Sequence, residues 1–111
     1  MNIVKYMRVG RVKAVIYVRG QDEGIQEIMC RLYAEDKRYD VVKVVKDIND
    51  AIDCDVLIVS HMSKISRNYI EYLHIANALR SKGIEIESAL NTNDKEDRLK
   101  KLELVEILKL L

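Results

Sequence analysis

The chain has 111 residues, of which 49% are hydrophobic and 33% charged, as expected for one ordered globular domain and not for a disordered segment. Its net charge of +1 lacks the basic excess that nucleic-acid-binding domains usually carry. No apolar run is long enough to span a bilayer, and no export signal opens the chain. We therefore expect a cytoplasmic protein without membrane contact.

Basic residues gather at the N-terminus without an acidic neighbour. A cluster of this kind indicates either an arm that contacts phosphates or, more simply, a solvated stretch. The cluster comprises Lys5, Arg8, Arg11 and Lys13.

The first half of the chain predicts a strand, a helix and two further strands. The near-continuous apolar run over 14–18 is typical of a strand that helices cover on both faces. Helical spacing of apolar residues predicts a helix over 23–38. Runs at 40–45 and 55–59 predict the second and third strands, with room for one or two helical turns between them. We expect the buried face of the helix to carry Ile25, Ile28, Met29, Leu32 and Tyr33.

A second helix and a fourth strand follow. Helical spacing extends over 68–82, Gly83 stands where a C-cap glycine belongs, and 84–87 alternates as a strand does. This order predicts a three-layer α/β fold over 13–90 with a mainly parallel four-stranded sheet. We expect the second helix to pack through Tyr69, Tyr72, Leu73, Ala76 and Leu79.

Residues 93–111 predict a long C-terminal helix, because the segment lacks glycine and proline and opens with cap candidates. Its large aliphatic residues fall on two or three faces, so more than one surface must cover it. We expect it to pack on its own domain and on another chain, most simply in a homodimer. The alternative is a helix packed wholly within a single domain of residues 1–111. The aliphatic residues are Leu99, Leu102, Leu104, Val105, Ile107, Leu108, Leu110 and Leu111.

Cationic side chains follow the first and third predicted strands. Arg19 follows the first strand, and Lys64 and Arg67 follow the third among several serines. Open α/β sheets form their binding sites where such strands end. The three cations therefore predict a pocket for phosphate or another oxyanion. The alternative is three solvated cations at a loop edge.

Two motifs at these positions resemble the N-terminal catalytic domain of serine recombinases, the resolvases and invertases. Tyr17-Val18-Arg19 fits the start of that family's Tyr-x-Arg-x-Ser, and Ile65-Ser66-Arg67-Asn68 fits the end of its Asp-Arg-Leu-Ser-Arg-Asn. The resemblance covers roughly residues 13–90. It implies the resolvase catalytic-domain fold and DNA as substrate. It also implies a serine nucleophile, arginines that balance phosphoryl charge, and neither metal nor other cofactor.

The chain departs from the family pattern at three functional positions. Gln21 stands where the family carries its nucleophilic serine, Ser63 replaces aspartate, and Lys64 replaces a catalytic arginine. An amide cannot form the covalent phosphoserine intermediate, and lysine lacks the bidentate guanidinium. The family also has a longer segment where this chain has only 46–55. We therefore expect no catalytic residues here, although Arg19 and Arg67 keep their family positions.

The leading hypothesis is a recombinase-like domain without DNA cleavage. It would act by oligomerisation or as the regulatory partner of an active recombinase, with weak DNA contact at most. Full recombinases continue into a DNA-binding module, and we expect none beyond Leu111. A second hypothesis is an active recombinase or nuclease with a relocated nucleophile at Ser60, Ser63 or Ser66, although Ser66 is more simply a helix cap. A third is a small phosphate-ligand binding module.

The remaining ionisable residues predict no metal site. His61 has no evident carboxylate beside it, and His74 is expected to be partly exposed in mid-helix. Cys30 and Cys54 are too few for a disulfide framework and are expected to be reduced and partly buried. The acidic residues between the second and third strands are most simply solvated turn residues, the alternative being a phosphoacceptor or Mg²⁺ site. They are Asp47, Asp50, Asp53 and Asp55.

Overall fold

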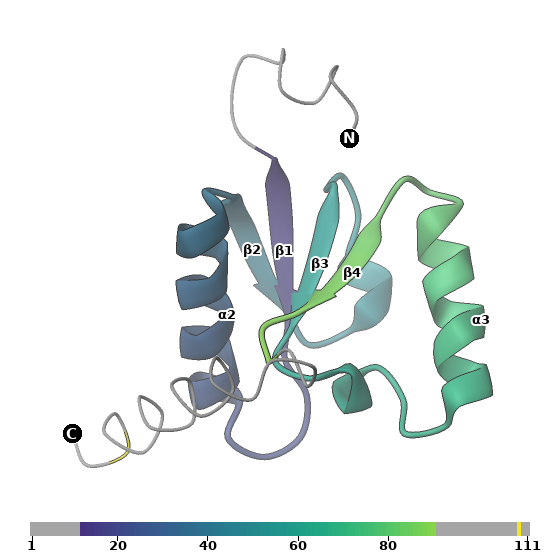
Figure 1. Ribbon diagram of the computed structural model, residues 1–111, viewed down its shortest axis with the longest axis horizontal. Coiled ribbons are helices and arrows are strands. Elements are labelled where there is room, and N and C mark those ends of the chain that lie inside the picture. Colours follow the sequence, from purple (N-terminus) through teal and green to yellow (C-terminus); the bar gives the residue numbers. More distant parts are fainter. Residues whose placement is uncertain (1–11, 91–108, 110–111) are drawn as a thin grey trace.

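The computed structural model describes residues 12–90 and residue 109. It forms a four-stranded parallel sheet in the order β2-β1-β3-β4, with α2 and α3 on opposite faces (Figure 1). The three-layer α/β prediction is confirmed. The basic residues at 5–11 lie outside the described residues, as does the predicted helix at 93–111 apart from residue 109. The elements are β1 (Lys13–Tyr17), α2 (Glu23–Lys37), β2 (Asp40–Val45), η1 (Ile48–Asp50), β3 (Val56–Val59), η2 (Met62–Lys64), α3 (Tyr69–Arg80) and β4 (Glu85–Ser88).

The chain order places a topological switch point between the two central strands. From β1 the chain passes through α2 outward to β2, and from β3 it passes through α3 outward to β4. Because right-handed crossovers in opposite directions put their helices on opposite faces, the loops after β1 and β3 diverge. Ligand crevices of open α/β sheets form at such points, at the carboxyl ends of the strands.

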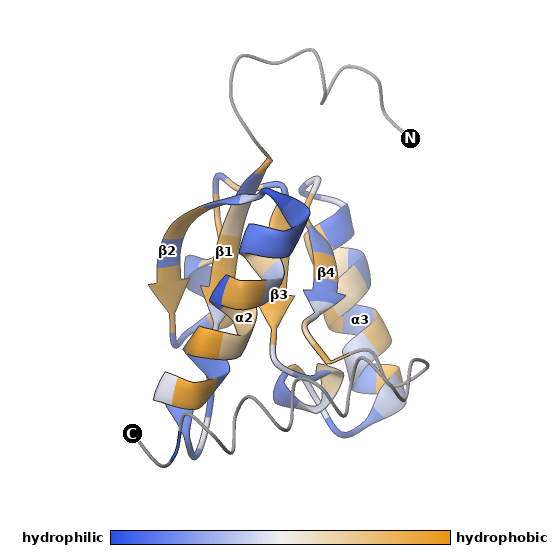
Figure 2. Cartoon of the chain, turned by 60° about the vertical axis from the view of Figure 1, so that its left-hand side comes forward, coloured by the Kyte–Doolittle hydropathy of each residue, from blue (hydrophilic) through white to orange (hydrophobic). Residues whose placement is uncertain are grey.

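Alternating side chains of the central strands build one hydrophobic cluster on each face. Val15 and Tyr17 of β1 join the cluster under α3, whereas Ala14, Ile16 and Val18 join the cluster under α2. Burial on both faces explains why these strands are apolar throughout. Figure 2 shows the central strands in hydrophobic colours and the helices in mixed ones.

The buried face of α2 differs from the predicted one. Ile28 and Leu32 are 38% and 41% exposed, and the prediction that they face the core is wrong. The small residues Cys30 and Ala34 pack on the sheet instead, which lets the helix approach closely. The buried face consists of Gln26, Met29, Cys30 and Ala34.

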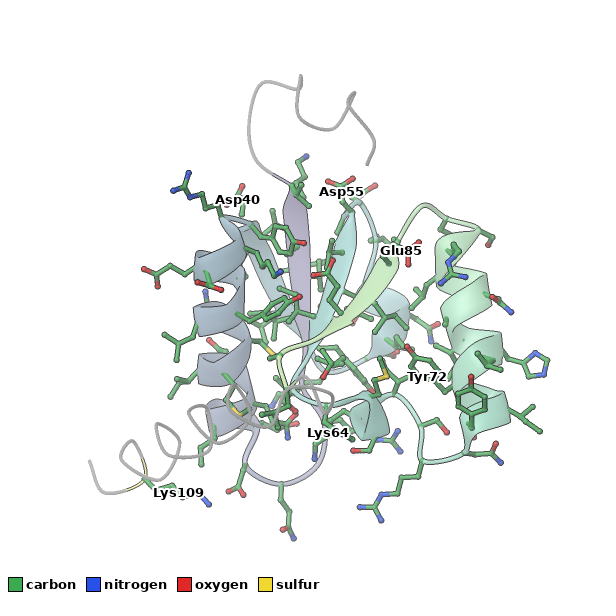
Figure 3. The ribbon with its side chains drawn as sticks, in the orientation of Figure 1. Asp40, Asp55, Lys64, Tyr72, Glu85 and Lys109 are labelled. Carbon is green, nitrogen blue, oxygen red and sulfur yellow. The ribbon has the colours of Figure 1, made fainter. Side chains whose placement is uncertain are left out.

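α3 also contacts the sheet through a narrower face than predicted. Tyr72, Ile75 and Leu79 belong to the core cluster, and Tyr72 lies between helix and sheet (Figure 3). Tyr69 and Leu73 are exposed, so their predicted burial is wrong. Among the strands, β4 has the most extensive contact with the helix. The helix ends at Arg80, and Gly83 takes φ +80° in the turn that leads to β4.

The Glu87 carboxylate on the edge strand β4 is hydrogen-bonded to two tyrosines from the other side of the sheet, near the edge strand β2. Glu87 accepts a hydrogen bond from the Tyr33 hydroxyl at 2.7 Å and from the Tyr39 hydroxyl at 3.0 Å to each carboxylate oxygen. Tyr33 belongs to α2 and Tyr39 precedes β2. Burial, and then the hydrogen bond to Glu87, raise the pKa of Tyr33.

We expect Tyr33→Phe to lower the free energy of unfolding by about 1.5–3 kcal/mol at pH 7, because it removes a hydrogen bond to a charged group. Because the pKa of Tyr33 is raised in the folded state, its contribution to stability also depends on pH. The contribution of Tyr33 is complete below the unfolded-state pKa of about 10 and is lost as the pH rises further, because the unfolded state then releases the proton more readily. Urea unfolding between pH 7 and pH 11 should therefore show a flatter alkaline decline for the variant. Tyr69→Phe, at an exposed position, is the matched control, and equal loss in both variants would contradict the prediction.

Candidate anion-binding site

An open crevice of about 760 Å³ lies at the switch point. The loop after β1 forms one wall, and the segment from η2 to the first turn of α3 forms the other. Lys64 is seen at this end of the sheet in Figure 3. The crevice brings together the five positions that the family motifs singled out, Arg19, Gln21, Ser63, Lys64 and Arg67. Ser60, the other candidate for a relocated nucleophile besides Ser63 and Ser66, is buried and does not line it. Its lining residues are Arg19, Gly20, Gln21, Ser63, Lys64, Ile65, Ser66, Arg67, Asn68 and Glu71.

A buried glutamine holds the β1 loop in shape. Gln26 of α2 is 4% exposed; its Oε1 accepts from the Arg19 backbone N–H at 3.0 Å, and its Nε2 donates to the carbonyls of Arg19 and Gln21 at 2.8 and 2.7 Å. Gly20 and Asp22 take positive φ values of 81° and 59°, so the loop turns sharply. Sequence reasoning missed Gln26. The available signal was a polar residue one turn before Cys30 in a predicted helix.

We expect Gln26→Leu to destabilise the fold by about 1–3 kcal/mol, because it leaves part-buried backbone groups without partners at nearly constant side-chain volume. Besides lowering the stability of the whole fold, the substitution should loosen the loop after β1. Amide hydrogen exchange should accelerate at Arg19 more than in β1. Gln21→Ala is the matched control, because its exposed side chain makes none of these bonds. An unchanged exchange rate of the Arg19 amide in Gln26→Leu would show that the loop keeps its conformation without the Gln26 hydrogen bonds, and would contradict the prediction.

His61 organises the opposite wall as a cap. Its Nδ1 accepts from the Ser63 backbone N–H at 3.1 Å and lies 2.9 Å from the Ser63 hydroxyl oxygen. Both contacts join His61 to Ser63, the next residue but one along the chain. His74 is exposed on α3.

The start of α3 fixes Arg67 at the crevice rim. The Asn68 side chain accepts from the backbone N–H groups of Ile70 and Glu71 at 3.0 and 3.2 Å, and the Ser66 hydroxyl accepts from the Asn68 N–H at 3.0 Å. The helix cap is therefore Asn68, and the prediction that Ser66 serves as the cap is wrong. Ser66 instead stabilises the turn that presents Arg67.

The crevice carries more positive than negative charge. Arg19, Lys64 and Arg67 face one carboxylate, Glu71. A Cβ at Gly20 would lie 4.0 Å from Lys64 Nζ, which shows that the ammonium lies against the β1 loop. Within the described residues, the ion pairs join other partners: Arg31–Glu27, Lys46–Glu23 and Arg80–Glu85. The three cations are thus available to an oxyanion, for which guanidinium groups are well suited.

The other candidate residues have local structural roles. The Asp47 side chain caps η1, and the Asp55 side chain accepts from the Lys13 N–H at 3.0 Å. No group of three His, Cys, Asp or Glu side chains in the described part of the chain could hold a metal ion. Cys30 is buried and Cys54 half-buried, and neither forms a disulfide within the described residues. Burial raises the pKa of the Cys54 thiol. Among the described helices, none is long and apolar enough to cross a membrane.

The fold is shared with solved catalytic domains. The chain is similar to the C-terminal catalytic domain of ISC1926 TnpA, an IS607-like serine recombinase, with a TM-score of 0.62 and 24% identity over 87% of this chain and 78% of that one. It is also similar to the N-terminal catalytic domain of TP901-1 integrase, with a TM-score of 0.59 and 18% identity over 88% of this chain and 95% of that one. The fold is therefore that of serine recombinase catalytic domains.

The sequence itself identifies the family. The family model for the resolvase N-terminal domain matches residues 3–111. The chain therefore belongs to the resolvase N-terminal domain family, as its two motifs indicated. Among curated proteins, none matches the sequence.

Proposed function

We propose that this chain is a resolvase-type domain that holds a DNA phosphate in the crevice without cleaving it. It acts by association, either with copies of itself or with an active recombinase. The observation that carries the proposal is the composition of one crevice. Arg19, Lys64 and Arg67 supply the charge for a phosphate, but Gln21 occupies the wall where the family resemblance places the nucleophilic serine. Binding chemistry is retained there and the family's attacking group is absent.

A second candidate function rests on the Ser63–His61 contact. Ser63 lines the crevice, and its Oγ lies 2.9 Å from His61 Nδ1, which is the spacing of an activated nucleophile and its base. In this scheme His61 takes the Ser63 proton as Oγ forms a bond to phosphorus, and then returns it to the departing DNA oxygen. The Ser63 N–H competes for the same nitrogen, so the cap described above is the simpler role. The cleavage assay in the Discussion separates the two.

We expect crevice binding to depend on the two arginines. Charge-assisted bonds contribute about 1.5–3 kcal/mol each, so Arg19→Ala and Arg67→Ala should each weaken binding of a short DNA by roughly ten- to hundredfold. Fluorescence anisotropy of a labelled 12-mer at two salt concentrations measures this. The slope of log affinity against log salt should also fall by about one unit per arginine removed.

The matched control is Arg31→Ala, an exposed arginine that pairs with Glu27 on α2. It removes the same charge away from the crevice. Equal weakening by Arg31→Ala and Arg67→Ala would show a diffuse electrostatic effect and would contradict a crevice site. An affinity that none of the variants changes would contradict it as well.

A further inference from the structure

We infer that the side-chain amide of Gln21 is a further phosphate-binding group of the crevice, which donates a hydrogen bond to the DNA backbone. This inference rests on the proposed phosphate site and adds a residue to it. Gln21 lines the crevice, and its side chain is exposed. Its backbone carbonyl accepts a hydrogen bond from Gln26, whereas its side-chain amide has no partner among the described residues. The amide is therefore available to a ligand.

The loop after β1 presents Gln21 together with Arg19. Nε2 of Gln26 donates to the carbonyl oxygens of Arg19 and Gln21 at 2.8 and 2.7 Å. Because Gln26 is buried, both oxygens point into the protein, and their partial negative charge is turned away from the crevice. Both side chains line the crevice, and two residues of chain separate their Cα atoms by at most about 7 Å. One phosphate can therefore contact the guanidinium and the amide.

The Lys64 ammonium lies beside the same loop. A Cβ at Gly20, the residue between Arg19 and Gln21, would lie 4.0 Å from Lys64 Nζ. The two cations supply charge at this point, and the amide supplies two N–H donors without adding charge. A phosphate has several oxygens to satisfy, so a neutral donor next to the cations complements them. The loop also holds its shape before the ligand arrives, which reduces the entropy lost on binding.

A nucleobase is the competing ligand for the Gln21 amide. Glutamine side chains bind the N6 and N7 atoms of adenine in the major groove. Here Arg19 stands two residues away on the same loop, and the Lys64 ammonium lies against Gly20. These cations attract the backbone of a bound strand, so the group that comes closest to the amide is a phosphate. The observations therefore favour a contact with the backbone, which does not depend on base sequence.

The test measures binding of a labelled 12-nucleotide DNA strand by fluorescence anisotropy at several salt concentrations. We expect Gln21→Ala to weaken binding by about tenfold, because a hydrogen bond to a charged oxygen is lost. The slope of log affinity against log salt should stay unchanged, since loss of a neutral amide alters no ion pair, whereas Arg67→Ala makes it shallower. Gln21→Glu should weaken binding further and also make the slope shallower, because a carboxylate of similar size repels the phosphate.

An abasic strand with the same backbone distinguishes phosphate from base contact. If the amide binds phosphate, Gln21→Ala should weaken binding of the abasic strand as much as binding of the strand with bases. Asn77→Ala is the matched control, because it removes an exposed amide on α3 that does not line the crevice. It should leave both affinities unchanged.

Four outcomes would overturn the inference. Binding that depends on Arg67 but not on Gln21 would remove the amide contact and leave the phosphate site standing. A loss in Gln21→Ala that disappears with the abasic strand would show a contact to a base. A loss that comes with a shallower salt slope in Gln21→Ala would show that the substitution displaced a cation. Failure of the unmodified protein to bind either strand would overturn the proposed function as well.

Discussion

Incubated alone with supercoiled plasmid, the protein is expected to leave the DNA supercoiled and to form no covalent protein–DNA adduct. Cleavage in the resembled family starts with a serine hydroxyl that becomes joined to the DNA phosphate. At that position the crevice presents Gln21, whose amide has no hydroxyl to attack with. Loss of a covalent nucleophile costs several orders of magnitude in rate, so the expected effect is complete on the timescale of an assay.

The assay needs two readouts. Gel electrophoresis detects nicked, linear or relaxed plasmid, and denaturing electrophoresis with labelled DNA detects a covalent adduct. Both are run with and without EDTA, so that a contaminating metal nuclease is recognised. Adduct formation that persists in EDTA and disappears in Ser63→Ala would replace the non-cleaving proposal with the Ser63–His61 scheme. Cleavage that persists in the Ser63→Ala variant would contradict both the non-cleaving proposal and the Ser63–His61 scheme.

Restoring the family residues tests how much of the active site remains. The triple change Gln21→Ser, Ser63→Asp and Lys64→Arg returns the nucleophile and the charged groups of the resembled motifs. We expect it to stay far slower than an intact recombinase, because only residues 46–55, with η1 among them, join β2 to β3. Ser63→Asp also removes the hydroxyl that contacts His61 Nδ1. Robust strand cleavage by the triple variant would show that the short connection is sufficient.

The strands and the crevice could be predicted from the sequence because each depends on a local signal. Burial on both faces makes β1 and β3 apolar throughout, and such runs are read without knowing their neighbours. The crevice followed from topology, since residues just after central parallel strands share one edge of the sheet. Arg19 and Arg67 line the same crevice for that reason.

The helix faces could not be predicted correctly, because polar groups outside the pattern decide them. Gln26 is buried by hydrogen bonds to the Arg19–Gln21 loop, and Ile28 and Leu32 then lie on the exposed side of α2. A pattern of hydrophobic residues does not reveal that a polar amide is buried when all its hydrogen bonds are made inside the protein. The role of His61 was missed for a similar reason, because its partners are the backbone N–H and the hydroxyl of Ser63 and a hydrophobic pattern does not reveal such short-range contacts.

The full-length protein is expected to sediment as a dimer or larger species at micromolar concentration. The predicted helix at 93–111 carries eight large aliphatic residues spread over several faces, more than one small sheet can cover. Each such side chain contributes about 1.5–3 kcal/mol when it is fully buried. Three or four left in water would forgo several kcal/mol, on the order of the whole stability of a domain. Association through this helix, most simply with two-fold symmetry, is the way to bury them.

Truncation after Asn93 should abolish the dimer and leave a monomer that is less soluble or partly unfolded. Because a truncated chain can fail for reasons other than lost association, the full-length chain supplies a second measurement. Its melting temperature should rise with protein concentration, since association that requires the folded state stabilises it by mass action. A full-length protein that stays monomeric at high concentration, with a melting temperature independent of concentration, would show that the aliphatic residues are covered within one chain. Association would then have to be removed from the proposed function, whereas the phosphate crevice, which lies within the described residues, would be unaffected.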